Sequence, residues 1–153
     1  MSELSASPID GVLLFAHGSR DPLWRLPIEA VALEMARLQP ALAVRCAYLE
    51  LCEPGLPEAA SHMIEGLMHS AQQSLNTINS IALDAHSITA KGQKRLKIRI
   101  LPMFLGMGKH ARHDLPELAS QLRQTHPQVD FEIAPAVGED PRLTRLLAQL
   151  AMA

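Results

Sequence analysis

Three side chains that can bind a divalent metal ion lie at the ends of apolar stretches of this sequence. His17 and Glu50 come at the ends of two such runs, and His110 follows a third run after a short segment that contains glycine. In a parallel α/β sheet, ligands bind beyond the carboxyl ends of the strands. If the three runs are parallel strands, two imidazoles and a carboxylate meet at one edge of the sheet, and these groups suit a borderline divalent metal ion.

The residues after His17 leave a second interpretation open. Gly18 lets the backbone turn sharply, and free amide groups at the start of the next helix favour an anion. Arg20 can bind a phosphate or a carboxylate through two parallel hydrogen bonds. This segment by itself fits a phosphohydrolase with a histidine nucleophile almost as well as a metal enzyme. Such hydrolases usually carry arginine directly before His-Gly, however, and this chain has Ala16 there.

The other candidate ligands also have simpler interpretations. Glu50 is costly to bury in an apolar strand unless it is paired or binds a metal, but it can also protrude into water. His110 can be an exposed loop residue. His113 lies next to an expected helix cap at Asp114, which suits a role at the edge of a substrate better than metal binding. We expect the four remaining histidines to face solvent: His62, His69, His86 and His126.

Length and composition fit a single globular domain. The chain has 153 residues, 48% of them hydrophobic and 20% charged, which is enough to bury a core. A net charge of -2 gives no electrostatic basis for binding nucleic acid or an anionic membrane, and 3% aromatic residues give none for stacking on bases. No apolar run approaches the ~20 residues that span a bilayer.

The termini and cysteines favour a cytoplasmic protein. Residues 1–10 form a tail with no basic cluster and no apolar segment, so we expect no secretory signal. Cys46 and Cys52 lack C-x-x-C spacing and are expected to be reduced thiols with a structural role.

Apolar runs and helix signals alternate along residues 11–153. We expect four strands, at about 11–16, 44–51, 97–105 and 129–137. We expect four helices between and after them, at about 22–38, 56–70, 114–126 and 141–152. This alternation predicts an α/β fold with an open, mostly parallel sheet and helices on both faces.

Residues from about 71 to 97 interrupt the alternation. They are polar and lose the helical period, so they are predicted to be an insertion with a mobile part near 90–93. The backbone amides of about 87–94 should exchange hydrogen fastest, because few apolar side chains anchor them. The insertion is either a lid over a binding site or an element of a dimer contact.

Five segments of the chain, in order, resemble the class II tetrapyrrole chelatases, and in particular the small sirohydrochlorin chelatases of the cobalt type. The segments are LFAHGSRDP (14–22), AYLEL (47–51, with Pro54), LPMFL (101–105, continuing to His110), HDLP (113–116) and VGEDPRL (137–143). They cover nearly the whole chain apart from the tail and the insertion, which is longer than the short link usual in small members.

The resemblance implies a single flavodoxin-like domain with a four-stranded parallel sheet, which pairs with a second copy as a homodimer. It implies a metal-inserting lyase that places a divalent metal ion in sirohydrochlorin. Cobalt would serve cobalamin synthesis, iron would serve sirohaem synthesis, and nickel is a further alternative. No cofactor is implied beyond the metal ion that is itself a substrate.

The resemblance also assigns roles to residues. His17, Glu50 and His110 would hold the metal, and the two imidazoles would accept the pyrrole protons. Five further residues would contact the carboxylate-bearing substrate: Ser19, Arg20, Lys109, Arg112 and His113. Three other functions remain open: a metal or tetrapyrrole carrier without turnover, a histidine phosphatase-like hydrolase, and a purely structural partner in a homodimer.

Overall fold

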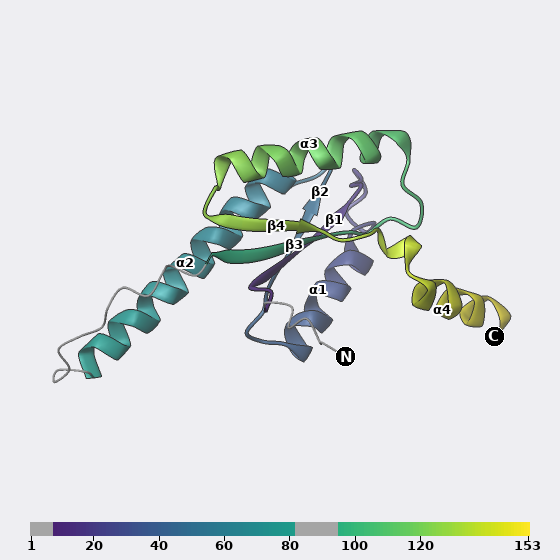
Figure 1. Ribbon diagram of the computed structural model, residues 1–153. Coiled ribbons are helices and arrows are strands. Elements are labelled where there is room, and N and C mark those ends of the chain that lie inside the picture. Colours follow the sequence, from purple (N-terminus) through teal and green to yellow (C-terminus); the bar gives the residue numbers. More distant parts are fainter. Residues whose placement is uncertain (1–7, 82–94) are drawn as a thin grey trace, which may run out of the picture.

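The computed structural model describes residues 8–81 and 95–153 and confirms a four-stranded parallel sheet (Figure 1). The strands are β1 (Gly11–Ala16), β2 (Ala43–Tyr48), β3 (Leu96–Pro102) and β4 (Val129–Ile133). They lie in the order β2-β1-β3-β4, and every pair is parallel. β1 is therefore central, and all six of its residues are buried, as expected for a strand covered on both faces.

Helices cover both faces of the sheet. α2 (Leu56–Ile81) and α3 (Lys109–Thr125) pack on one face, and α1 (Leu26–Leu38) lies on the other (Figure 1). The 3₁₀ helix η1 (Val137–Glu139) and α4 (Pro141–Met152) follow β4. The hydrophobic core lies between the sheet and the α2–α3 layer, where side chains of β1, β3 and β4 meet both helices.

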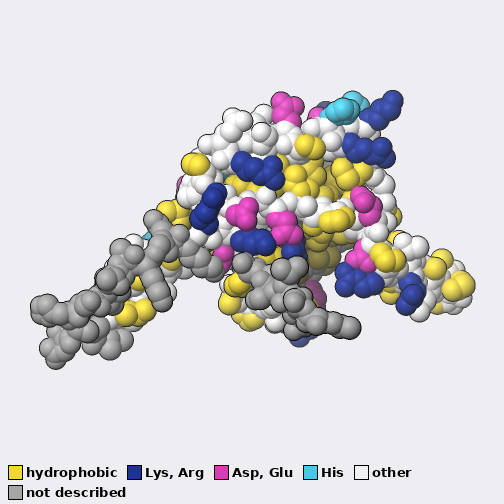
Figure 2. Space-filling view, in the orientation of Figure 1, with side chains coloured by type: hydrophobic (Ala, Val, Ile, Leu, Met, Phe, Trp, Pro, Cys, Tyr) yellow, Lys and Arg dark blue, Asp and Glu magenta, His cyan; other side chains and the backbone are white. Residues whose placement is uncertain are grey.

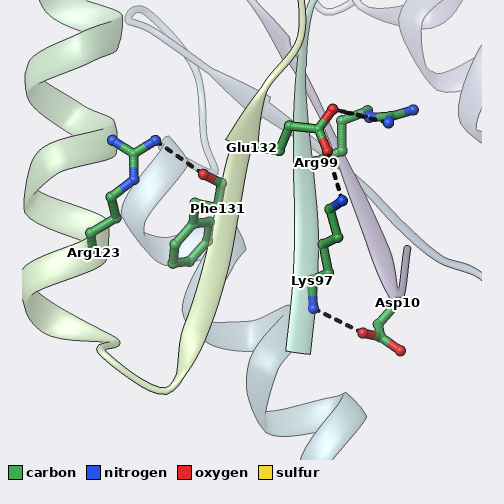
Figure 3. A network of polar contacts seen from close by, with 6 residues as sticks. All are labelled: Asp10, Lys97, Arg99, Arg123, Phe131 and Glu132. Carbon is green, nitrogen blue, oxygen red and sulfur yellow. Dashed lines mark hydrogen bonds and ion pairs between the residues drawn. The ribbon is translucent and has the colours of Figure 1, made fainter. Parts of the chain in front are cut away.

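The opposite face of β3 and β4 is charged. Arg99 donates hydrogen bonds to the Glu132 carboxylate at 3.2 and 3.0 Å, and the Lys97 ammonium lies 3.3 Å from the same group (Figure 3). Burial raises the pKa of Glu132, but the hydrogen bonds and charges of Lys97 and Arg99 outweigh it, so the pKa is lowered. The Lys97 amide donates to the Asp10 carboxylate at 2.8 Å. These pairs occupy the part of this face that α1 leaves uncovered.

α2 is longer than the sequence pattern predicts, and it continues through the first part of the expected insertion to Ile81. In its exposed half, the hydroxyls of Ser70, Ser74 and Thr77 donate to carbonyls four residues earlier, which gives these side chains partners but does not stabilise a helix. The Gln72 side-chain amide donates to the Asn76 side chain at 3.1 Å, and a pair at this spacing contributes about 0.2–0.5 kcal/mol to a helix. The expected mobile part near 90–93 lies outside the described residues.

Two helices begin elsewhere than predicted. α1 begins at Leu26 rather than near residue 22, because the Asp21 side chain accepts from the Leu23 amide at 2.9 Å and closes a separate turn. α3 begins at Lys109, five residues before the expected cap at Asp114. β2, β3 and β4 also end earlier than the apolar runs suggested. In the two described ranges, no helix combines the length and apolar character needed to cross a membrane.

Candidate metal and substrate site

The carboxyl ends of the three adjacent strands β2, β1 and β3 are joined by hydrogen bonds that continue beyond the sheet. The Glu50 amide donates to the His17 carbonyl at 3.0 Å, and the Leu49 amide donates to Ala16 at 2.9 Å. On the other side of β1, the Met103 amide donates to Phe15 at 2.7 Å. The segments that directly follow β1, β2 and β3 are therefore joined to one another at the strand ends.

A glycine allows the first two loops to touch. Gly18 has a φ of +97°, and a Cβ atom placed there would lie 1.8 Å from the Glu50 carbonyl oxygen. No residue with a side chain fits this approach without moving one of the loops. The glycine after His17 therefore determines how closely His17 and Glu50 can lie.

His17 and Glu50 form the centre of the candidate site. The His17 Nε2 atom lies 3.7 Å from the Glu50 Oε1 atom, and the two side chains are 51% and 55% exposed. An imidazole nitrogen and a carboxylate oxygen at this separation can both bind one divalent ion. Because both groups face water, an ion can enter and leave without any movement of the core.

His110 is not part of this pair in the structure. It is the second residue of α3 and is exposed on the first helical turn, rather than on a loop as the sequence suggested. No cluster of three or more histidine, cysteine, aspartate or glutamate side chains in residues 8–81 and 95–153 is placed to hold a metal ion. The structure thus brings together two of the three predicted ligands, and the third lies on the neighbouring helix.

The structure corrects the expected start of the third helix, which the sequence pattern places at Asp114 because Asp114, Pro116 and Glu117 resemble a helix cap. Four residues of the helix are buried at helical spacing: Ala111, Leu115, Ala119 and Leu122. The stripe begins at Ala111, ahead of Asp114, and Pro116 lies inside the helix. Burial of this face offsets the hydrogen bond that proline cannot make. The expected cap at Asp114 is therefore wrong, and Gly108 is the residue that precedes the first turn.

The five predicted substrate-binding residues fall into two groups. Ser19 and Arg20 lie two and three residues after His17, and the Ser19 hydroxyl accepts from the Asp21 amide at 3.1 Å. Lys109, Arg112 and His113 are exposed on the first turns of α3 beside His110. Within the described parts of the chain, Arg20, Lys109 and Arg112 form no ion pair, so their charges are available to an acidic ligand.

The remaining histidines differ among themselves. His62 and His69 are exposed, as expected. His126 is partly buried, contrary to the expectation, because its Nε2 atom lies 3.3 Å from the Ser61 hydroxyl and its ring packs against Phe131. His86 lies outside the described residues. Cys46 and Cys52 are free thiols, as predicted.

The sequence is similar to known proteins over most of its length. The family model for CbiX matches residues 11–71 and 77–152 of the chain. Two proteins named sirohydrochlorin cobaltochelatase match over most of both chains. The one from Sulfolobus acidocaldarius is 26% identical over 141 residues, which is 92% of this chain and 89% of that protein. The one from Methanopyrus kandleri is 25% identical and covers 89% of this chain and 90% of that protein.

Two solved structures share the fold. The putative cobalamin biosynthesis CbiX protein from Marinobacter aquaeolei covers 93% of both chains with 24% identity and a TM-score of 0.61. The sirohydrochlorin chelatase SirB from Bacillus subtilis subspecies spizizenii, in complex with cobalt, matches 93% of this chain with 17% identity and a TM-score of 0.65. The match covers 49% of the SirB chain, so this chain corresponds to about half of SirB.

Proposed function

The chain belongs to the CbiX family, and from this premise we propose that it inserts a divalent metal ion, cobalt in the first place, into sirohydrochlorin. The observation that carries the proposal is the open His17–Glu50 pair at the carboxyl edge of the sheet. Two relatives that match the chain nearly end to end are named for the same reaction. Cobalt insertion would serve cobalamin synthesis in the cytoplasm, where the two free thiols stay reduced.

His17 and Glu50 are the residues that receive the metal ion. A neutral imidazole and a carboxylate bind cobalt, iron and nickel alike, and the carboxylate offsets part of the ionic charge. Two ligands on an open edge hold the ion more weakly than a closed four-ligand site. Weak holding suits an enzyme that must pass the ion on to the macrocycle.

The macrocycle gives up two pyrrole protons as the metal enters, and no electron is transferred. A neutral histidine accepts such a proton near neutral pH. His17 stands at the metal, and His110 stands at the start of the adjacent helix. We assign one proton to each imidazole: His110 accepts one at its free ring nitrogen, and His17 accepts the other at the nitrogen that the metal ion leaves as it enters the macrocycle. Water then removes both protons at this open edge. The exposed side chains of Arg20, Lys109 and Arg112 pair with the substrate carboxylates. Ser19 and His113, which lie next to these cations in the sequence, contact the edge of the substrate.

The proposal is tested by mixing the purified protein with sirohydrochlorin and cobalt(II) and following the absorbance of the macrocycle. Conversion faster than the protein-free reaction supports a chelatase. Binding of the macrocycle without spectral conversion would support a carrier instead, and hydrolysis of a generic phosphomonoester would support the hydrolase. Parallel assays with iron(II) and nickel(II) rank the metals.

Replacing Glu50 with glutamine should lower metal affinity and insertion rate about tenfold or more. The amide keeps the size of the side chain but removes the negative charge that attracts the ion. Unfolding should change little, because an exposed ion pair contributes about 0–1 kcal/mol. Titration with cobalt(II) and the insertion assay measure the two effects. Glu58→Gln, in the first turn of α2, is the matched control. An unchanged affinity and rate in Glu50→Gln would remove Glu50 from the site.

We propose further that the active form is a homodimer, because two helices leave apolar side chains uncovered. None of the residues of α1 or α4 is buried. The exposed apolar residues of these two helices are Leu26, Val31, Leu33, Leu38, Leu146, Leu147, Leu150 and Met152. α4 packs against η1 and projects away from the sheet (Figure 1), and yellow side chains line it (Figure 2). Such surfaces are typical of a contact between two chains.

Sedimentation should therefore give twice the chain mass of 16.7 kDa. Leu150→Asp should shift the equilibrium toward the monomer by about tenfold or more, because a charge would be buried in the contact. Met68→Asp is the control, since Met68 is exposed on α2 but lies outside α1, α4 and the expected insertion. A fully active monomer at the assay concentration would contradict the dimer.

A further inference from the structure

Two exposed leucines lie at the same edge of the sheet as the metal-binding pair. Leu51 directly follows Glu50 and is 51% exposed, and Leu105 lies in the loop after β3 and is 70% exposed. β2 and β3 are the two neighbours of β1, so the two leucines lie on either side of the loop that carries His17. Neighbouring strands lie ~4.8 Å apart, so β2 and β3, from whose ends the two leucines follow, are separated by roughly 10 Å.

The backbone of Leu51 is held in an unfavourable conformation. Its φ is 66°, in the left-handed region that glycine or asparagine occupies more easily. The half-exposed side chain gains little from burial to offset this conformation. Backbone strain of this kind occurs most often at binding and catalytic sites, where the surrounding structure maintains it. Here the Glu50 amide bonded to His17 and the Tyr48 amide bonded to Pro54, at 2.9 Å, hold the two ends of the turn.

Leu105 is also displayed on a fixed backbone. The Gly138 amide donates to the Phe104 carbonyl at 2.9 Å, and a Cβ atom on Gly138 would lie 1.9 Å from the Leu105 carbonyl oxygen. The loop after β3 therefore packs directly on η1, and it does so at a glycine that leaves room for it. The side chain of Leu105 points into solvent although its main chain is anchored.

Given the proposed function, we infer that Leu51 and Leu105 form an apolar seat for the flat face of the tetrapyrrole. The seat lies beside the metal-binding pair, and the exposed cations Arg20, Lys109 and Arg112 lie on the loops and helix that follow β1 and β3. An apolar centre with cations near it matches a conjugated ring that is apolar on its face and acidic at its rim. The leucines position the ring above the metal and take no part in proton transfer.

The test uses Leu51→Asn, Leu105→Ser and the double variant, with Leu75→Ser on α2 as an equally exposed control. Asparagine accepts a positive φ, so Leu51→Asn removes the apolar side chain without adding strain. The measurements are the Kd for metal-free sirohydrochlorin by fluorescence, the Kd for cobalt(II) alone, the steady-state KM and kcat, and the Tm. Leu51→Met and Leu105→Met test whether any apolar side chain of similar size suffices.

We expect each polar variant to raise the Kd for the macrocycle about tenfold, a change typical of a lost apolar contact in a binding site. KM should rise more than kcat falls, and the Met variants should stay within about threefold of the parent protein. The Kd for cobalt(II) and the Tm should not change, since the leucines neither bind the ion nor support the core. A purely structural leucine would lower the Tm instead.

An unchanged Kd for the macrocycle in the double variant would overturn the seat. So would an equal rise of this Kd in Leu75→Ser. Conversion of the polar variants to monomers would overturn it as well, because the leucines would then contact the second copy of the chain. The seat and the proposed function fail separately. If the parent protein binds sirohydrochlorin through these leucines but inserts no cobalt, the seat stands and the chelatase proposal is wrong. If the parent protein inserts cobalt and the double variant binds sirohydrochlorin normally, the chelatase proposal stands and the seat is wrong.

Discussion

Replacing His17 or His110 with alanine should lower cobalt insertion into sirohydrochlorin by about 100-fold or more while the fold remains intact. Each change removes a proton acceptor, and general base catalysis typically contributes 10²–10⁴-fold. His17→Ala also removes one of the two groups that hold the ion. Both side chains are exposed, so the free energy of unfolding should change by no more than about 0.5 kcal/mol. The absorbance assay and thermal unfolding measure the two effects.

The geometry separates the two histidines further. Only His17 lies beside Glu50 in the structure, so cobalt binding in the absence of the macrocycle should weaken in His17→Ala and remain near normal in His110→Ala. His62→Ala is the control, because His62 is exposed on α2 and is not proposed to bind the metal. Near-normal turnover in either His17→Ala or His110→Ala would refute the two-histidine mechanism.

The order and type of the main elements could be predicted because they depend on local patterns. The run from Gly11 to Ala16 is apolar at every position, which is typical of a strand buried on both faces, and β1 has these bounds. The second half of α2 could not be predicted in the same way, because it has no apolar stripe facing the core. A polar side-chain pair four residues apart, Gln72–Asn76, supports the helix there, and such a pair leaves no apolar period in the sequence.

The composition of the candidate site could be predicted, but its geometry could not. His17 and Glu50 are predicted to be neighbours because each follows the end of a strand in the same sheet. In the structure, the His17 Nε2 and Glu50 Oε1 atoms are 3.7 Å apart. The sequence placed His110 on a loop because Asp114 and Pro116 resemble a helix start. The buried Ala111 shows that tertiary packing extends the helix past these local signals. The positive φ of Leu51 could not be predicted, because it depends on a contact between loops that are distant in sequence.

Gly18→Ala should be one of the most damaging single-methyl changes among residues 8–81 and 95–153. At a φ of +97° any side chain is strained, and the new Cβ atom would overlap the Glu50 carbonyl oxygen, which lies 1.8 Å from its ideal position. The backbone of the Gly18 loop or of the Glu50 loop must move, because the Cβ atom and the carbonyl oxygen are both fixed to main chain and no flexible side chain can give way. We expect the free energy of unfolding to fall by about 2–4 kcal/mol. Cobalt binding and insertion should fall with it, since His17 and Glu50 separate when their loops move apart.

Gly106→Ala is the matched control, because it adds the same methyl group at the same edge of the sheet and meets no atom within 4 Å. Its stability and its cobalt affinity should stay close to those of the parent protein. Denaturant unfolding at one fixed protein concentration, with cobalt(II) titration of the folded variants, compares the two substitutions directly. If Gly18→Ala binds cobalt as Gly106→Ala does, then the contact between the two loops does not set the metal site, and the metal must be held elsewhere.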